Sequence, residues 1–322
     1  MSLVTHLIPA ALFRLRLLRV RFVLQALVDC RLPDYLGSTL RGALAMSYRR
    51  MVCTFDNRPC DGCPVQRTCP YPTMFETPQA SGSQDIRRMR DIPHPILIEP
   101  PLPHPRRYQA GDWLTFDIVM LGQAHTRLPY LIFAVNEMAG QGLGAQRTPF
   151  QLLSVTDESG VPLYSTETGQ VLSPLNPHLL GERCRMESPV HSVRVVLETP
   201  LRIKADGALR GRELTLQQFL QQGCRRLGNL LTVYEQVLPE EVDFRPLLQQ
   251  PQPQLHSANL RWWDLERYSN RQKSTLKIGG LLGEMELRDI THPWWLVLQA
   301  LQEVHLGKST IMGLGKIRLE QR

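Results

Sequence analysis

The sequence predicts an α+β protein in which two ferredoxin-like β-α-β-β-α-β units follow one another, the first with a cysteine-rich insertion. Its 322 residues exceed the ~250 residues at which a single hydrophobic core usually stops growing. Hydrophobic residues make up 43% of the chain and no tract is of low complexity, so it can bury two cores. The same order of strand and helix patterns occurs twice, around a Pro/Gly/Asn-rich stretch at 173–187. We therefore expect domains at residues 1–175 and 188–322.

In the first unit, hydrophobic periodicity predicts each element in turn. Alternating apolar and basic residues at 13–17 run into an apolar stretch at 20–28, which predicts a strand with a positive face. Apolar residues recur at helical spacing over 37–52, with Arg41, Arg49 and Arg50 largely off the apolar stripe, which predicts a basic helix. The remaining elements are a short strand at 96–98, a strand at 113–122, a helix at 128–139 and a strand at 149–156.

The second unit repeats this order more clearly. The expected elements are a strand at 193–203, an amphipathic helix at 214–234, strands at 258–268 and 276–290, a helix at 293–304 and a strand at 316–319. In both units this order predicts a four-stranded antiparallel sheet with two helices on one face.

Four of the seven cysteines form a metal-binding pattern. Cys53, Cys60, Cys63 and Cys69 are spaced C-x6-C-x2-C-x5-C in an insertion at about 53–105 whose proline-dense part cannot be regular helix. Four thiolates suit a structural zinc ion, and a four-iron, four-sulfur cluster uses the same ligands. We expect zinc, because no redox step is evident. The other three cysteines are expected to be small buried residues.

Two basic segments of the second unit could bind a polyanion. Lysine plus arginine exceed aspartate plus glutamate by 37 to 30, which gives a charge of +7 and favours polyanionic partners. Between the last helix and strand, His305–Lys316 holds three glycines, two lysines and two hydroxyls, which suit phosphate oxygens. It is not a nucleotide-binding P-loop, because it runs from helix to strand. A tight turn is the alternative. Arg267–Lys273 adds cations, an aromatic ring and amides at a hairpin, which could instead be a solvated tip.

These segments resemble a known family. His305–Lys316, Arg267–Gln272, Thr199–Lys204 and Leu40–Leu44 ahead of the four cysteines are similar to the CRISPR-associated endoribonucleases that process precursor CRISPR RNA. These enzymes are members of the RAMP superfamily, and the four cysteines point to a branch with a cysteine insertion. The resemblance covers nearly the whole chain, but the glycine-rich loop alone does not separate nucleases from RNA-binding scaffolds. RNA would be bound by Arg41, Arg49, Lys204, Arg267, Tyr268, Arg271, Gln272, Lys273, Gly307, Ser309, Gly313, Gly315 and Lys316.

The resemblance implies metal-independent cleavage by the ribose 2′-hydroxyl, which leaves a 2′,3′-cyclic phosphate and a 5′-hydroxyl. Such a reaction needs an acid–base group and positive charge at the phosphate. Many family members carry a catalytic histidine on or near the first helix, whereas 37–52 contains none. We therefore expect His305, beside the glycine-rich loop, to be catalytic with Lys308. Tyr48 on the first helix is a further catalytic candidate, and the main competitor is activity through tyrosine, lysine and arginine without a histidine. The other histidines are expected to be structural or exposed.

The expected partner is CRISPR repeat RNA. Subunits of a CRISPR effector complex and a second copy of the chain remain further partners to consider. A non-catalytic RNA-binding subunit of such a complex is the alternative function, and a zinc-containing DNA-binding regulator fits less well because no helix-turn-helix or zinc-finger spacing is present. No membrane span and no export signal are evident, so we expect a cytoplasmic protein.

Overall fold

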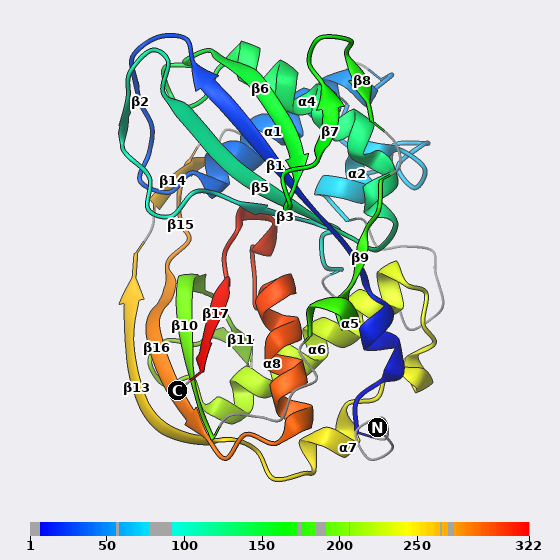
Figure 1. The fold of residues 1–322 in the computed structure, drawn as a ribbon, viewed down its shortest axis with the longest axis vertical. Helices are drawn as coiled ribbons and strands as arrows, with labels where there is room; N and C mark the ends of the chain where they lie inside the picture. Colours follow the sequence, from blue (N-terminus) through cyan, green and yellow to red (C-terminus); the bar gives the residue numbers. More distant parts are fainter. Residues whose placement is uncertain are drawn as a thin grey trace. The chain divides into compact units, whose positions relative to one another are not determined.

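The computed structural model describes residues 7–55, 58–77, 92–172, 175–184, 191–205, 207–264, 266–269 and 274–321. The chain divides into two compact units (Figure 1). Arg16–His178 form the N-terminal unit, and Leu179–Arg322 together with Met1–Leu15 form the C-terminal unit. The division at 178/179 lies in the region that the sequence marks as a boundary. The first 15 residues, however, group with the second unit, although the sequence predicts that they belong to the first.

The N-terminal unit is built on an antiparallel sheet with two helices on one face (Figure 1). Its main elements are β1 (Arg16–Ala26), α1 (Gly37–Val52), β3 (Ile96–Glu99), β5 (Trp113–Leu121), α4 (Leu128–Gln141) and β6 (Phe150–Asp157). The strand order β3-β5-β1-β6 is the one predicted for a ferredoxin-like unit. Phe22 on β1 stacks on Phe116 on β5, with ring centroids 5.4 Å apart, in the core beneath the helices.

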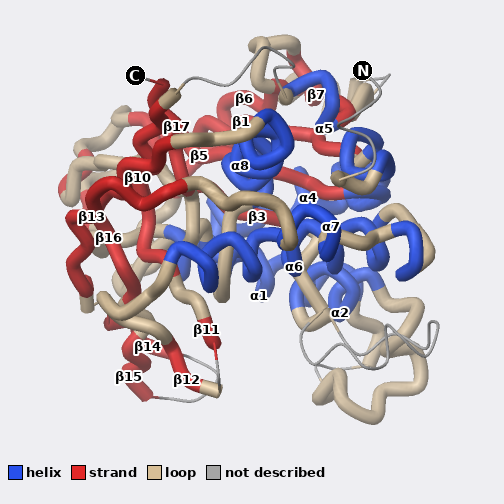
Figure 2. Tube along the Cα trace, turned by 90° about the horizontal axis from the view of Figure 1, so that it is seen from below, coloured by secondary structure: helices blue, strands red, loops and turns tan. Residues whose placement is uncertain are grey.

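The C-terminal unit has the same strand order (Figure 2). Its main elements are β10 (Ser192–Leu201), α6 (Leu216–Tyr234), β13 (Gln254–Trp263), β16 (Gly280–Arg288), α8 (His292–Val304) and β17 (Ile317–Gln321). The sheet runs β13-β16-β10-β17, and all its pairs are antiparallel. Alternate residues of β10 are buried against α6 and α8, which is the period-2 pattern of a sheet covered on one face.

Both units also contain shorter helices and strands. In the N-terminal unit they are β2 (Cys30–Arg31), α2 (Pro70–Phe75), β4 (Arg107–Tyr108), η2 (Gly122–Arg127), β7 (Pro162–Ser165) and β8 (Gln170–Val171). β9 (His178–Leu179) lies at the division. In the C-terminal unit they are η1 (Ala10–Arg14), α5 (Leu180–Arg183), β11 (Lys204–Ala205), β12 (Ala208–Leu209), η3 (Pro239–Glu241), α7 (Arg245–Leu248), β14 (Glu266–Ser269), β15 (Ser274–Lys277) and η4 (Thr310–Met312). No helix of the described residues is long and apolar enough to cross a membrane.

The segment around 258–290 differs from the prediction of two long strands. β13 ends at Trp263, and β14 and β15 form a separate two-stranded hairpin before β16 begins at Gly280. A Cβ on Gly280 would lie 2.8 Å from the carbonyl oxygen of Leu201, so β16 begins where the backbone of β10 comes close. Alternation alone cannot show such a break, because residues of the hairpin keep the period of the strands beside them.

Candidate nucleic-acid interface

The glycine-rich segment His305–Lys316 is folded tightly against the end of β10. The amide of Lys308 donates to the carbonyl oxygen of Arg202 at 2.8 Å, and the amide of Gly315 donates to that of Pro200 at 3.1 Å. The hydroxyl of Thr199 donates to the carbonyl oxygen of Gly313 and accepts from the amide of Lys316, both at 2.8 Å. Thr199–Lys204 and this segment, which both carry the family resemblance, are thus in direct contact.

Two glycines of this loop are required by packing. Gly307 has φ +88° and a Cβ there would lie 2.4 Å from the carbonyl oxygen of Arg202. Gly315 has φ +73° and a Cβ there would lie 1.7 Å from the carbonyl oxygen of Leu306. These values mean that no other residue fits either position without moving the backbone. The tight-turn explanation therefore accounts for both glycines, and it leaves Lys308, Ser309 and Lys316 as partly exposed side chains of the loop that a phosphate can reach.

His305, the expected catalytic histidine, is enclosed in this conformation. Its side chain is 0% exposed, and its Nδ1 lies 3.3 Å from the carbonyl oxygen of Leu314. Its own carbonyl oxygen accepts a hydrogen bond of 2.8 Å from Nε of the buried Arg226, which also donates to Val304 and so closes the end of α8. Burial lowers the pKa of Arg226 to about 10. The sequence places His305 next to the loop correctly, but the side chain points into the core.

Tyr48, the alternative on α1, is also buried. It is 0% exposed, and its ring packs edge-on against Phe75 of α2 with centroids 5.3 Å apart. Burial raises the pKa of Tyr48 to about 12, so the hydroxyl is a poor proton donor or base near neutral pH. Its hydroxyl has no hydrogen-bond partner among the described residues. Tyr48 thus joins α1 to the insertion and is not placed to touch a substrate.

Arg41 and Arg49 on α1 face the insertion. Nη2 of Arg41 donates to the carbonyl oxygen of Phe75 at 2.8 Å, and its guanidinium lies 5.9 Å from the centre of the Phe75 ring. The guanidinium of Arg49 lies 5.4 Å from the centre of the Tyr71 ring, and its Nη2 donates to the carbonyl oxygen of Arg58. Both side chains are partly exposed. They hold α2 and the cysteine segment against α1, and they keep positive charge at its edge.

His94, for which the sequence predicts no function, lies near Arg41 in the structure. Its Nε2 lies 3.1 Å from the carbonyl oxygen of Phe75, the same oxygen that Arg41 binds. Because a carbonyl oxygen only accepts, Nε2 carries the proton and Nδ1 is the basic nitrogen. The side chain is partly exposed. No local sequence signal could have shown this position, because 53 residues separate His94 from Arg41 and the contact depends on the path of the insertion.

The four cysteines of the insertion line one small pocket, with a volume of about 20 Å³. Arg49 and Arg58 line the same pocket, and Gly62, with φ +73°, allows the turn between Cys60 and Cys63. Burial, and then the Glu76 carboxylate, raise the pKa of the Cys60 thiol to about 11. Among the described residues, no group of three or more His, Cys, Asp or Glu that could hold a metal ion is found. Zinc therefore remains a prediction.

The remaining predicted RNA-binding residues lie on loops of the C-terminal unit. Lys204 is exposed on the β11–β12 hairpin, and Lys316 is partly exposed with its Nζ 3.9 Å from a carboxylate oxygen of Glu198. In the β14–β15 hairpin, Arg267 pairs with Leu276 and Tyr268 with Thr275. Arg271, Gln272 and Lys273 lie outside the described residues. The hairpin prediction is therefore correct for the backbone of residues 266–269 and 274–277, which the structure describes.

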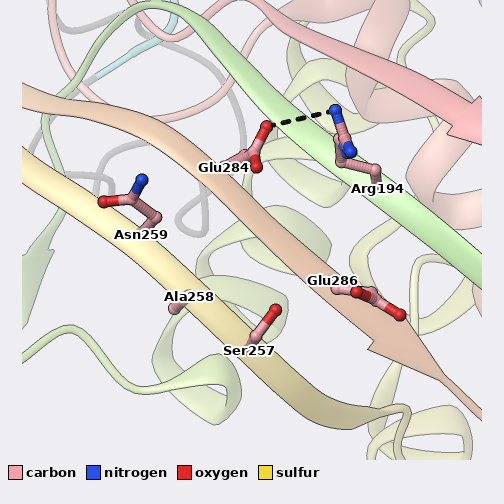
Figure 3. A pocket seen from close by; sticks show the side chains of 6 residues that line it. All are labelled: Arg194, Ser257, Ala258, Asn259, Glu284 and Glu286. Carbon is pink, nitrogen blue, oxygen red and sulfur yellow. Dashed lines mark ion pairs between the residues drawn. The ribbon is translucent and has the colours of Figure 1, made fainter.

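The open face of the C-terminal sheet is a poor surface for RNA. A shallow pocket of about 130 Å³ on this face is lined by Arg194, Glu284 and Glu286 and by residues of the edge strand β13 (Figure 3). Arg194 lies 3.4 Å from Glu284 and 3.6 Å from Glu320, so its charge is offset by two carboxylates. Carboxylates on the surface repel phosphates. The carboxylates of this face therefore make the loops of the unit the better candidates for binding RNA.

Comparison with known proteins finds related domains and folds. Residues 15–176 match the model of the AF_1859_N N-terminal domain, and residues 195–317 match that of the CRISPR-associated endoribonuclease Cas6. No curated protein matches the chain. Among solved structures, a product complex of Cas6 is 16% identical with a TM-score of 0.53, over 94% of this chain and 99% of the other. Cas6 of Thermus thermophilus is 13% identical with a TM-score of 0.50, over 95% and 99%.

Larger relatives contain a similar region within a longer chain. A Cas6-RT-Cas1–Cas2 complex is 16% identical with a TM-score of 0.58 over 96% of this chain. This chain spans only 29% of the length of that relative, and 46% of the length of the relative in a partial complex. At these identities the structures show a shared fold. One family model covers half of the chain and the Cas6 model covers most of the remainder. The chain therefore belongs to the family that the AF_1859_N N-terminal domain defines, and its residues 195–317 form a domain similar to the CRISPR-associated endoribonuclease Cas6.

Proposed function

We propose that the protein is an endoribonuclease that cuts CRISPR precursor RNA within its repeats. The observation that carries this proposal is the Cas6 endoribonuclease domain at 195–317, whose glycine-rich loop is built as a defined element with Lys308 and Ser309 partly exposed. An amide-rich loop with a lysine suits a phosphodiester. Structures of Cas6 with a product and with a substrate mimic are among the similar folds.

The proposed reaction is an attack of the ribose 2′-hydroxyl on the adjacent phosphate. A base takes the hydroxyl proton, the 2′-oxygen forms a bond to phosphorus, and the bond from phosphorus to the 5′-oxygen breaks. The leaving 5′-oxygen takes a proton, so the products are a 2′,3′-cyclic phosphate and a 5′-hydroxyl. Positive charge near the phosphate stabilises the transition state, and general acid–base groups contribute about 10²–10⁴-fold.

His94 with Arg41 is the pair that we propose for this chemistry in place of His305 and Tyr48. Both side chains reach the carbonyl oxygen of Phe75, at 3.1 Å and 2.8 Å, so an imidazole and a guanidinium lie side by side. The imidazole can move a proton near neutral pH, and the guanidinium can bind a phosphate oxygen. Their partial exposure is what distinguishes them from the two buried residues.

A structural zinc ion in the insertion is a further part of the proposal. Cys53, Cys60, Cys63 and Cys69 would hold the ion, with no open position for a substrate. Four thiolates and a divalent cation carry two net negative charges, and Arg49 and Arg58 at the same pocket would offset them. Such a site would fix a segment with few apolar residues of its own. A four-iron, four-sulfur cluster is the alternative occupant.

A non-catalytic RNA-binding subunit is the second candidate function. The burial of His305 and Tyr48, at 0% exposed each, supports it, because it removes two of the residues expected to act. Subunits of a CRISPR effector complex are proposed partners for either function. The Cas1 and Cas2 named in the longer relatives are proposed only by analogy. We keep a homodimer and a cytoplasmic location as proposals.

Incubation of the protein with repeat RNA in EDTA separates the two functions. We expect cleavage at one position, with a 2′,3′-cyclic phosphate on the upstream product and no cleavage of a scrambled RNA. Tight binding of repeat RNA without any cleavage would support the RNA-binding subunit and contradict the nuclease. Cleavage that begins only after a divalent cation is added would contradict the metal-independent mechanism.

A further inference from the structure

A short two-stranded ribbon extends the N-terminal sheet beyond β1 and β5. β1 and β5 pair up to Gln25 opposite Trp113, and after a turn on each side β2 and β4 resume in the same register. In this ribbon Cys30 lies opposite Tyr108, and both are buried, at 8% and 2% exposed. Figure 1 shows β2 at the end of the sheet. The ribbon is thus anchored to the core on one face only.

Two arginines lie directly opposite each other on the other face of the ribbon. Arg31 on β2 pairs with Arg107 on β4, and both side chains are exposed. Like charges in directly opposed positions of an antiparallel pair are unfavourable. Unless an anion lies between them, this arrangement opposes the folding of the ribbon.

No carboxylate in the described structure neutralises this pair. Neither Arg31 nor Arg107 forms a side-chain hydrogen bond or ion pair with a described residue. The carboxylates of the neighbouring segments have other partners. Asp34 binds Arg106, Asp29 accepts from the amide of Ala110 at 2.9 Å, and Asp112 accepts from the amide of Gln109 at 2.7 Å. Both guanidinium groups therefore keep their donors for a ligand.

A third arginine stands on the neighbouring turn between α4 and β6. The turn packs against β2, because a Cβ on Gly144 would lie 3.2 Å from Cδ2 of Leu32 and 3.9 Å from the carbonyl oxygen of Arg31. The same turn carries Arg147, which is exposed and has φ +50°, a conformation that residues other than glycine seldom adopt. The amide of Arg147 donates to the carbonyl oxygen of Gly144 at 3.3 Å, which ties it to this turn.

We infer that Arg31, Arg107 and Arg147 bind the phosphodiester backbone of the RNA substrate on the N-terminal unit. This inference rests on the proposed function, and it adds a contact that the glycine-rich loop of the other unit does not provide. Guanidinium groups match phosphate oxygens in pairs. Trp113, which opens β5 five residues after Tyr108 of the ribbon, is 67% exposed and can stack on an unpaired base. Arginines on the same unit as an exposed aromatic ring favour single-stranded RNA over an acidic protein surface.

The test is the salt dependence of RNA binding. Fluorescence anisotropy would measure the affinity for repeat RNA, with a 2′-deoxy nucleotide at the cut site, between 50 and 200 mM salt. For the Arg31→Gln/Arg107→Gln protein we expect a slope of log K against log salt that is shallower by about 1.4, from about 0.7 per phosphate contact on a single strand. Arg147→Gln should lower it by about 0.7. Arg31→Lys/Arg107→Lys should keep most of the wild-type slope.

Two controls make the result specific. Arg212→Gln/Arg225→Gln removes the same charge from exposed positions of the C-terminal unit and should bind nearly as the wild type does. Without RNA, Arg31→Gln/Arg107→Gln should melt at the same temperature as the wild type or higher, because repulsion is removed. If the double variant melts at a lower temperature, Arg147→Gln decides the question alone.

The inference and the proposed function fail in different ways. A wild-type protein that cuts repeat RNA, together with an arginine variant that keeps the wild-type affinity and slope, would overturn the inference and leave the function intact. A wild-type protein that binds repeat RNA without cutting it would contradict the nuclease, whereas a shallower slope in the arginine variants would still support the site. Equal losses in the arginine and control variants would show that general charge is responsible and would also overturn the site.

Discussion

The N-terminal and C-terminal units share one strand order, but they place their polar chemistry differently. In the C-terminal unit the segment between the last helix and strand, His305–Lys316, folds back on β10 and buries His305. In the N-terminal unit the corresponding turn is short, and the elaboration lies between α1 and β3, where His94 meets Arg41. A histidine next to a functional loop in sequence can therefore be structural, whereas a histidine inside an insertion can lie at the candidate active site.

The comparison also separates two uses of glycine. Gly307 and Gly315 are required because a Cβ at either position would overlap a backbone carbonyl oxygen, that of Arg202 or that of Leu306. Gly207, on the exposed β11–β12 turn, has the same left-handed conformation with open space around it. Glycine content by itself therefore does not distinguish a loop in which the backbone is closely packed from a turn with open space around it.

The largest effect is expected from the histidines. His94→Ala should lower the single-turnover cleavage rate by about 10²–10⁴-fold, because it removes the proposed acid–base group. His305→Ala should cut at the wild-type rate once folded, and its free energy of unfolding should fall by about 2–4 kcal/mol from the cavity that it leaves. The measurements are a quench-based cleavage assay and urea unfolding. A His305→Ala protein that is stable and inactive would reverse our assignment.

The second effect concerns the glycines. Gly315→Ala should reduce the free energy of unfolding of the C-terminal unit by about 3 kcal/mol or more, because the new Cβ would overlap the carbonyl oxygen of Leu306. Gly207→Ala, the matched control in the same unit, should lose only about 1–2 kcal/mol from its left-handed backbone. Urea unfolding measures both. Equal losses would mean that the loop relaxes and that close packing does not require Gly315.

The third effect concerns the cysteine pocket. We expect about one zinc ion per chain by elemental analysis, and a strong chelator should lower Tm by on the order of 5 °C. Cys60→Ser should lose the ion, whereas Cys30→Ser, a buried cysteine of the same unit outside the pocket, should keep it. Absorption near ~400 nm would point to the iron–sulfur alternative. Isolation without metal and with four freely reactive thiols would contradict both.

The smallest effect is expected for Tyr48. Tyr48→Phe removes a buried hydroxyl that has no partner among the described residues, so stability should be unchanged or slightly higher. Cleavage should proceed at the wild-type rate, because the hydroxyl is enclosed. A rate that falls by a factor of 100 would place Tyr48 in the reaction and would revive the first-helix alternative to His94.

Much of the fold could be predicted from the sequence, because its core elements carry regular hydrophobic periods. The helix predicted at 37–52 is α1, Gly37–Val52, and the strand predicted at 113–122 is β5, Trp113–Leu121. Both strand orders follow from the order of elements. The separate β14–β15 hairpin and the grouping of the first 15 residues could not be predicted, because they depend on which distant segments pack together.

The candidate site was only partly predictable, for a physical reason. The sequence pattern identified the glycine-rich loop and grouped the four cysteines together. In the structure those four cysteines line one pocket. Burial is a property of the folded chain, so the sequence could not show that His305 and Tyr48 are enclosed or that His94 lies beside Arg41. The opposed arginines Arg31 and Arg107 also become neighbours only through strand pairing.

Cleavage by the ribose 2′-hydroxyl is the central claim, and a single substitution in the RNA tests it most directly. The wild-type protein would be incubated in EDTA with repeat RNA in which only the nucleotide 5′ of the scissile phosphate lacks its 2′-hydroxyl. We predict that this RNA binds with the affinity of the unmodified repeat and is not cut. Cleavage of the modified RNA at the same position and rate would contradict the account.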